Sequence, residues 1–288
     1  MSTIIRRVSF SRDNQPFIEF TDGKNVWQIN PLEQDVSLQF DTSQRFCIGG
    51  HDMKTGENYA CPYSATVDEK YEQCVQCMKA TGFNPAFYHA TVVSEQQLAR
   101  NAEPHIVYLA YFAPNVLKVG ISHAKRGIAR LLEQGARATT VLLECKTADI
   151  ARSYEAKITG IYNIRDTVQL SKKADLARIP FDAKQAQRVM HNAARDLQAD
   201  LQVTFDGVDV QLLDLYYFKT ATTPDLTQAI NLDTQQAIIG DSIGMLGSIL
   251  YCEYDRQIVY LPLKKYTGYA LHEVSEPLDL GVQQMTLF

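Results

Sequence analysis

Apolar and polar residues alternate along the first forty residues of the chain. The segments VSFSRD, FIEFTDG, NVWQIN and VSLQF follow one another, with turn residues between them. A period of two places alternate side chains on opposite faces of an extended strand. Residues 5–40 therefore predict short antiparallel strands.

The centre of the chain changes pattern twice. Two apolar runs, HIVYLAYF and VLKVGIS, lie on either side of APN and predict a β-hairpin. The next segment, HAKRGIARLLEQGA, has Ile128, Leu131 and Leu132 at helical spacing, and Gly135 is a suitable helix end. TTVLLECKT then predicts a third strand, and ADIARSYEAKITGIY predicts a second helix.

The remainder contains one more helix and a second group of strands. Residues 182–200 have a helical pattern, residues 202–273 return to strands, and the end of the chain lacks periodicity. We expect an α+β protein with four parts: a β-rich N-terminal domain over residues 1–100, a hairpin-and-helix module over 101–180, a helix with a small β-rich domain over 181–275, and a flexible tail over 276–288.

The overall charge gives little sign of a polyanion-binding protein. The net charge is −5, so binding to nucleic acid would need a local basic face. The N-terminus lacks the apolar stretch of a signal peptide, and the longest apolar runs are interrupted by Asp241, Ser242 and glycines. We therefore expect a cytoplasmic protein with no membrane partner, in which six cysteines serve as thiols or metal ligands rather than disulfides.

Four cysteines lie close together in the N-terminal third: Cys47, Cys61, Cys74 and Cys77. EQCVQC forms a C-x2-C turn that lets two thiolates face one ion, and the other two cysteines complete a four-sulfur set suited to structural Zn²⁺. His51 or His89 could replace one of them. Buried thiols without a metal and a redox-active C-x2-C pair are the alternatives.

Four features follow one another within residues 106–155. They are a triplet ending in Tyr108, the KVG triplet ending in Gly120, Arg130 in the next helix and Glu155 in the helix after the third strand. This order resembles the GIY-YIG nuclease superfamily, which includes homing endonucleases and the excision-repair incision nuclease. The segment is most similar to a bacterial branch that places a cysteine-rich segment before a VYLA…KVGIS…R…QGA core.

The resemblance implies hydrolysis of phosphodiester bonds. Tyr108 would help to activate water, Arg130 would stabilise the phosphate, and Glu155 would hold one divalent ion, Mg²⁺ or Mn²⁺. A guanidinium offers paired donors to an anionic phosphate, and a hard cation prefers oxygen ligands. Each of these residues could instead be an ordinary strand or helix-surface residue.

Two positions depart from the superfamily pattern. Lys118 stands where the second triplet has tyrosine, and Ile106 stands where the first triplet has glycine. Lys118 could bind phosphate or, if desolvated, act as a base. Arg126 is an alternative to Arg130, because the helix begins later than is typical of the superfamily.

Basic residues are concentrated in the same stretch of the chain. Lys125, Arg126 and Arg137 predict a DNA-binding face beside the catalytic residues. The alternative is a set of ordinary helix-surface charges, some of them paired with Glu133 and Asp149.

The last residues, QMTLF, resemble the peptide that binds the bacterial DNA polymerase sliding clamp. Gln284 would hydrogen-bond at the rim of the clamp pocket, Met285 would occupy a shallow site, and Leu287 and Phe288 would enter the apolar cleft. The alternative is that Leu287 and Phe288 fill a gap in the core of this protein.

Together these features predict a metal-dependent DNA endonuclease, with branched or single-stranded DNA as candidate substrates. It would be nucleoid-associated and recruited to replication or repair by the clamp. A catalytically inactive adaptor that binds nucleic acid is the alternative, and Lys118 favours it. A nuclease that acts on RNA is a third interpretation.

Overall fold

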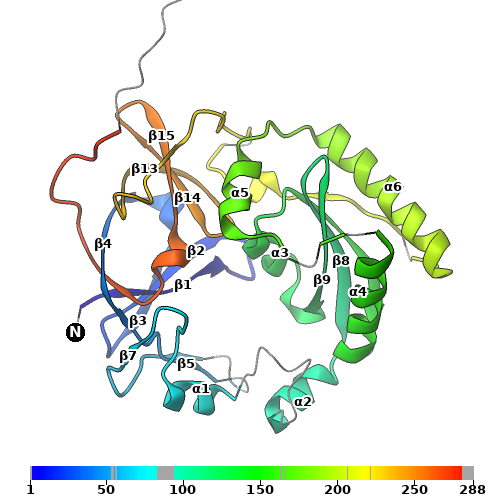
Figure 1. Ribbon diagram of the computed structural model, residues 1–288, viewed down its shortest axis with the longest axis horizontal. Coiled ribbons are helices and arrows are strands. Elements are labelled where there is room, and N and C mark those ends of the chain that lie inside the picture. The colour runs from blue at the N-terminus through cyan, green and yellow to red at the C-terminus, as the bar shows by residue number, and fades with distance from the viewer. Residues whose placement is uncertain are drawn as a thin grey trace, which may run out of the picture.

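The structure is a computed structural model that describes residues 2–52, 55, 57–82, 94–162, 164–165, 167–205, 207–220 and 222–280, except the side chains of residues 161 and 162. Figure 1 shows a large, curved sheet on one side and a smaller, helix-covered sheet on the other. This is the expected α+β class.

Ten strands from both ends of the chain form the large sheet, in the order β12-β15-β14-β13-β4-β16-β1-β2-β3, with β7 paired to β4. In chain order they are β1 (Ile4–Phe10), β2 (Pro16–Thr21), β3 (Val26–Ile29), β4 (Asp35–Phe46), β7 (Thr66–Val67), β12 (Ile230–Asn231), β13 (Ala237–Leu246), β14 (Ile249–Tyr254), β15 (Gln257–Pro262) and β16 (Tyr269–His272). The N-terminal strands are antiparallel, as expected.

The expected division into separate N-terminal and C-terminal β-rich domains does not match the strand pairing. β4 lies between β13 and β16, so strands from residues 1–100 and 181–275 share one sheet. Periodicity identifies a strand and its buried face, but it does not identify a partner about 200 residues away.

The small sheet has four strands in the order β11 (Gln211–Leu212), β10 (Ala138–Cys145), β8 (His105–Ala113) and β9 (Val116–His123). Its helices are α3 (Ala129–Gln134), α4 (Ala148–Tyr162), α5 (Leu170–Ala177) and α6 (Ala183–Leu201). The predicted hairpin, third strand and helices are confirmed. α5 was not predicted, and most of the strand expected from VDVQLLDLYYF is loop.

Strand β8 is buried on both faces, which explains its continuous apolar sequence. Tyr108, Ala110 and Phe112 belong to the core that the small sheet shares with α3, α5 and the large sheet. The side chains between them belong to a second core beneath α4 and α6.

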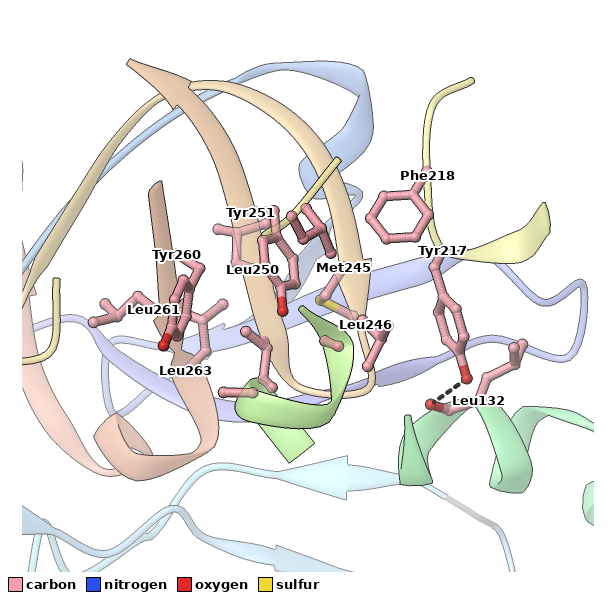
Figure 2. Close-up of a cluster of buried hydrophobic side chains, with 14 of the residues drawn as sticks. Leu132, Tyr217, Phe218, Met245, Leu246, Leu250, Tyr251, Tyr260, Leu261 and Leu263 are labelled. Carbon is pink, nitrogen blue, oxygen red and sulfur yellow. Dashed lines mark hydrogen bonds between the residues drawn. The ribbon is translucent and has the colours of Figure 1, made fainter. Parts of the chain in front are cut away.

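The end of α3 packs on the turn between β13 and β14 and on Tyr217, which lies between β11 and β12 outside the sheet strands. The hydroxyl of buried Tyr217 donates to the carbonyl oxygens of Ala136 at 2.7 Å and Leu132 at 3.3 Å. Figure 2 shows Tyr217 pointing toward Leu132, with Leu246 of β13 nearby. The C-terminal end of α3 is therefore fixed by residues from the other half of the chain.

A small cysteine-rich lobe follows β4 and contains β5 (Gly50–His51), β6 (Asn58–Tyr59) and α1 (Val75–Thr81), with α2 (Glu95–Asn101) further along the chain. In the part of the chain described above, no helix combines the length and apolar character needed to cross a membrane.

The first part of the segment expected to be a flexible tail, residues 276–280, lies against the large sheet. The backbone of Asp279 exchanges two hydrogen bonds with the side chain of Gln235, and Leu278 and Leu280 pack on the core. These apolar contacts explain why an aperiodic sequence is held in place here.

Candidate functional site

The Tyr108 ring has room to lie across the neighbouring strand because the residue opposite it, Gly120, has no side chain. It lies directly opposite Gly120 in the β8–β9 pair, and it is only 1% exposed. A Cβ atom at Gly120 would lie 2.5 Å from the Tyr108 hydroxyl oxygen, far inside van der Waals contact. The ring therefore lies across β9 over Gly120, and a larger residue there would displace the phenol.

Charged groups from several elements act on the Tyr108 hydroxyl. Burial raises its pKa, and the charged groups that act on it are, in order, Arg130, Glu155, Arg126 and Glu133. The two arginines oppose the rise and the two carboxylates add to it. Residues from β8, from the α3 region and from α4 therefore come within electrostatic reach of one phenol.

Glu133 joins the two arginines. One nitrogen of Arg126 donates to both carboxylate oxygens, at 2.7 and 2.6 Å, and Arg130 donates to one of them at 3.0 Å. The hydroxyl of buried Ser9, on β1 of the large sheet, donates to the same carboxylate. The large sheet thus helps to position the arginines of the site.

The balance of charges keeps Glu133 ionised. Burial alone would raise its pKa, but Arg126, the Ser9 hydroxyl and Arg130 outweigh burial and hold the pKa below its usual value. We did not predict Glu133 as a site residue. The signal that could have indicated it is its spacing of three residues from Arg130 on one helix.

Arg126 and Arg130 reach the same carboxylate from different elements. Arg126 ends a 3-10 turn, Ala124–Arg126, and Arg130 lies in the first turn of α3. Their side chains are similarly exposed, at 37% and 34%. The structure therefore brings both candidate arginines to the site.

Lys118 and Glu155 approach Tyr108 from different sides of the sheet. Lys118 pairs with Ala110, so it lies on the same sheet face as Tyr108 and Gly120, and it is 9% exposed. Glu155 is half-buried on α4, which covers the opposite face. α4 also packs against β9, the edge strand of the small sheet.

Two of the three residues expected to bind DNA remain accessible, and one does not. Lys125 is 77% exposed and pairs with Glu103 at 2.7 Å, and Arg126 lies at the site described above. Arg137 is buried. It donates to Asp214 at 2.5 Å and to the carbonyl oxygen of Ile179 at 2.7 Å. The prediction for Arg137 was wrong because its partner lies 77 residues away in the chain.

The four cysteines of the lobe come together. Cys47 follows β4, Cys61 follows β6, Cys74 caps α1, and Cys77 lies in the first turn of that helix. All four are buried, and their sulfur atoms lie within 4.8 Å of one another. Sulfurs arranged around Zn²⁺ at about 2.3 Å would be about 3.8 Å apart. The cluster could therefore hold a metal such as zinc with little movement.

Backbone amides point at the sulfur atoms of this cluster. The amides of Cys74 and Gly49 donate to the Cys47 sulfur at 3.1 and 3.4 Å. Burial raises the pKa of Cys47 to about 11, whereas hydrogen bonds outweigh burial at Cys74 and lower its pKa. Gly49 has a φ of +83°, and a Cβ there would meet the Tyr59 carbonyl oxygen at 2.0 Å, so this turn requires glycine.

Two buried arginines attach the lobe to the large sheet. Arg6 of β1 forms an ion pair with Glu19 and donates to the Ile48 carbonyl oxygen at 2.7 Å and to that of Gly50. Arg45 of β4 links the carbonyl oxygens of Thr267 and Glu69 in the same way. The residues on both sides of Cys47 are therefore held by the sheet.

The tail residues expected to bind the clamp, Gln284, Met285, Leu287 and Phe288, lie outside the described residues.

Comparison with known protein families identifies the family of the chain. A family model described as a protein of unknown function (DUF2797) matches residues 33–271. The match extends from the residues just before β4 to β16, so it includes the cysteine lobe, the small sheet and most of the large sheet. Searches of curated proteins and of solved structures gave no match.

Replacing Glu133 with glutamine tests the arginine arrangement. We expect Glu133→Gln to lower the free energy of unfolding by about 1–3 kcal/mol at pH 7, because Arg126 and Arg130 lose a charged partner. Since the folded-state pKa is depressed, this contribution is present above the unfolded value of about 4.3 and is lost as the pH falls through the folded value.

Denaturant unfolding at pH 7 and at about pH 3 measures the difference. Glu144→Gln, which changes an exposed carboxylate, is the matched control and should alter stability little. Equal stability of Glu133→Gln and the wild type at pH 7 would contradict the assigned arrangement.

Proposed function

We propose that this chain, which belongs to the DUF2797 family, is a metal-dependent DNA endonuclease that hydrolyses phosphodiester bonds. The observation that carries the proposal is the group of charges around Tyr108. A buried phenol lies within electrostatic reach of two guanidinium groups and of the Glu155 carboxylate. Such a site offers donors to an anionic phosphate and an oxygen ligand to a hard cation.

Each side chain has a proposed role. Tyr108, whose raised pKa keeps it protonated at neutral pH, orients the attacking water through its hydroxyl. Lys118 contacts the phosphate or accepts a proton from the water. Arg130, which makes one hydrogen bond to Glu133 where Arg126 makes two, is the better placed to exchange a carboxylate for a phosphate. Lys125 and Arg126 contact the flanking DNA.

A divalent ion completes the proposed site. Glu155 would hold Mg²⁺ or Mn²⁺, and the bound ion would neutralise the charge that develops on the phosphate. The half-buried carboxylate suits a hard cation that retains most of its water.

An inactive adaptor that binds nucleic acid is the second candidate. Glu133 already occupies donors of both Arg126 and Arg130, and Lys118 replaces the second tyrosine of the superfamily. Both features favour binding without cleavage.

A nuclease assay separates the two functions. Single-stranded, duplex and branched DNA and a matched RNA are incubated with Mg²⁺ or Mn²⁺. We expect the wild type to cleave DNA, and we expect Glu155→Ala to cleave at least about 100-fold more slowly, because the ion loses its ligand.

Glu144→Ala, which removes an exposed carboxylate, serves as the control and should leave the rate unchanged. Binding of DNA by the wild type without cleavage would support the adaptor. Preferential cleavage of RNA would support the RNA-directed nuclease.

We also propose that the four-cysteine cluster holds structural Zn²⁺. Its ligands are all sulfur and buried, so the site has no open position for substrate. Zinc would stabilise a lobe that has little regular structure of its own.

Metal analysis tests the zinc proposal. Protein purified without chelators should contain about one zinc per chain, and Cys77→Ser should lose the metal and melt at a lower temperature. Cys145→Ser, a buried cysteine outside the cluster, should keep the metal. Wild-type protein without zinc would leave the four cysteines as plain thiols.

Recruitment by the sliding clamp is proposed from the sequence of the tail alone. In a pull-down with the purified bacterial clamp, the wild type should bind, and the double variant Leu287→Ala/Phe288→Ala should not, because the apolar anchors are lost. Gln283→Ala, just before the motif, is the control. If the clamp retained the double variant as well as the wild type, the tail would not be the clamp-binding segment.

A further inference from the structure

Positive charge continues along the sheet away from Tyr108. Lys118 lies next on the same face, opposite Ala110. Beyond it, the ammonium of Lys173 on α5 lies 5.7 Å from the centre of the Phe112 ring. Phe112 belongs to the same core as Tyr108, four residues further along β8. At about 3.3 Å per residue this span is about 13 Å, which is long enough for more than one phosphate of a strand.

Lys173 is the centre of this positive charge. Burial and the like charges of Lys118, Lys264 and Arg130 lower its pKa to about 8. Among the described residues, no carboxylate forms an ion pair with Lys173 or acts on its pKa. The like charges of Lys118, Lys264 and Arg130 repel the Lys173 ammonium, so a bound anion would stabilise this arrangement.

These lysines lie on elements that belong to, or pack on, both sheets. α5 packs on β8 of the small sheet and on β15 of the large sheet, and it lies between them in Figure 1. Lys264 lies in the 3-10 turn Leu263–Tyr266 that follows β15. Lysine side chains therefore lie on the hairpin, on α5 and beside the large sheet.

We propose that Lys118, Lys173 and Lys264 form a track that binds the backbone of one nucleic-acid strand leading away from the phosphate at Tyr108. The inference rests on the proposed function, because it takes that phosphate as the start of the track. The strand is single because Lys118 is only 9% exposed, and a recessed ammonium is reached by a thin chain rather than by the surface of a duplex.

Neighbouring lysines provide matched controls. Lys172 adjoins Lys173 on α5 and is exposed, and Lys265 adjoins Lys264 but is paired with Asp233 at 2.5 Å. The experiment compares Lys173→Met and Lys264→Met with Lys172→Met and Lys265→Met. Binding of a labelled single-stranded oligonucleotide, a duplex of the same sequence and inorganic polyphosphate is measured without divalent ions over a range of salt concentrations.

We expect each track variant to weaken single-strand binding by about five- to tenfold. The slope of log affinity against log salt should become shallower by about 0.7 for each lost phosphate contact. The control variants should match the wild type. Equal losses in track and control variants, or no loss in the track variants, would overturn the proposal, as would tighter binding of duplex or polyphosphate than of the single strand.

A second measurement uses the folded wild type. At pH 8, Lys173 should react faster than Lys172 with a limiting amine reagent, and the oligonucleotide should protect Lys173 selectively. Lack of protection despite bound oligonucleotide would contradict the track. Because neither measurement requires cleavage, a protein that binds single strands through the track but cleaves nothing would refute the nuclease and keep the track.

Discussion

The register of the β8–β9 pair is the constraint on which the candidate site depends. It sets Tyr108 opposite Gly120, so the phenol lies across the neighbouring strand, and it puts Lys118 on the same face two residues further along. A slip of one residue would turn these side chains toward the core beneath α4 and α6. Burial of both faces of β8 opposes such a slip, because either face would then carry the wrong side chains into a packed core.

The site is also completed by residues from outside the hairpin-and-helix module. Ser9 on β1 bonds to the Glu133 carboxylate, and Tyr217 holds the end of α3. Both contacts act on the helix that carries Arg130. The large sheet is therefore a positioning element of the proposed nuclease module and not a separate attachment. The same sheet anchors the cysteine lobe through Arg6 and Arg45.

Local features of the sequence predicted the local parts of the structure. The apolar runs around APN identified the hairpin, helical spacing identified the helix of Arg130, and EQCVQC identified one turn of the cysteine cluster. Long-range pairing could not be predicted in this way. The ion pair of Arg137 with Asp214 and the partners of β4 join residues far apart in the chain, and no periodicity encodes them.

Two smaller differences have separate causes. α5 has only eight residues, two of them adjacent lysines, so its helical pattern is too short to stand out. The sequence indicates Glu133 only as a surface partner of neighbouring charges, because its buried serine partner on β1 cannot be inferred from helix spacing.

The central place of β4 has a consequence for the order in which the protein is built on the ribosome. β4 emerges early, but its neighbours β13 and β16 are translated about 200 residues later. Until then its edges present unsatisfied amides and carbonyls, which favour association with other chains or with chaperones. A prematurely terminated product would keep the hairpin and its arginines but lack the finished scaffold around them. The charged residues around Tyr108 therefore reach their final arrangement only after the whole chain has been synthesised.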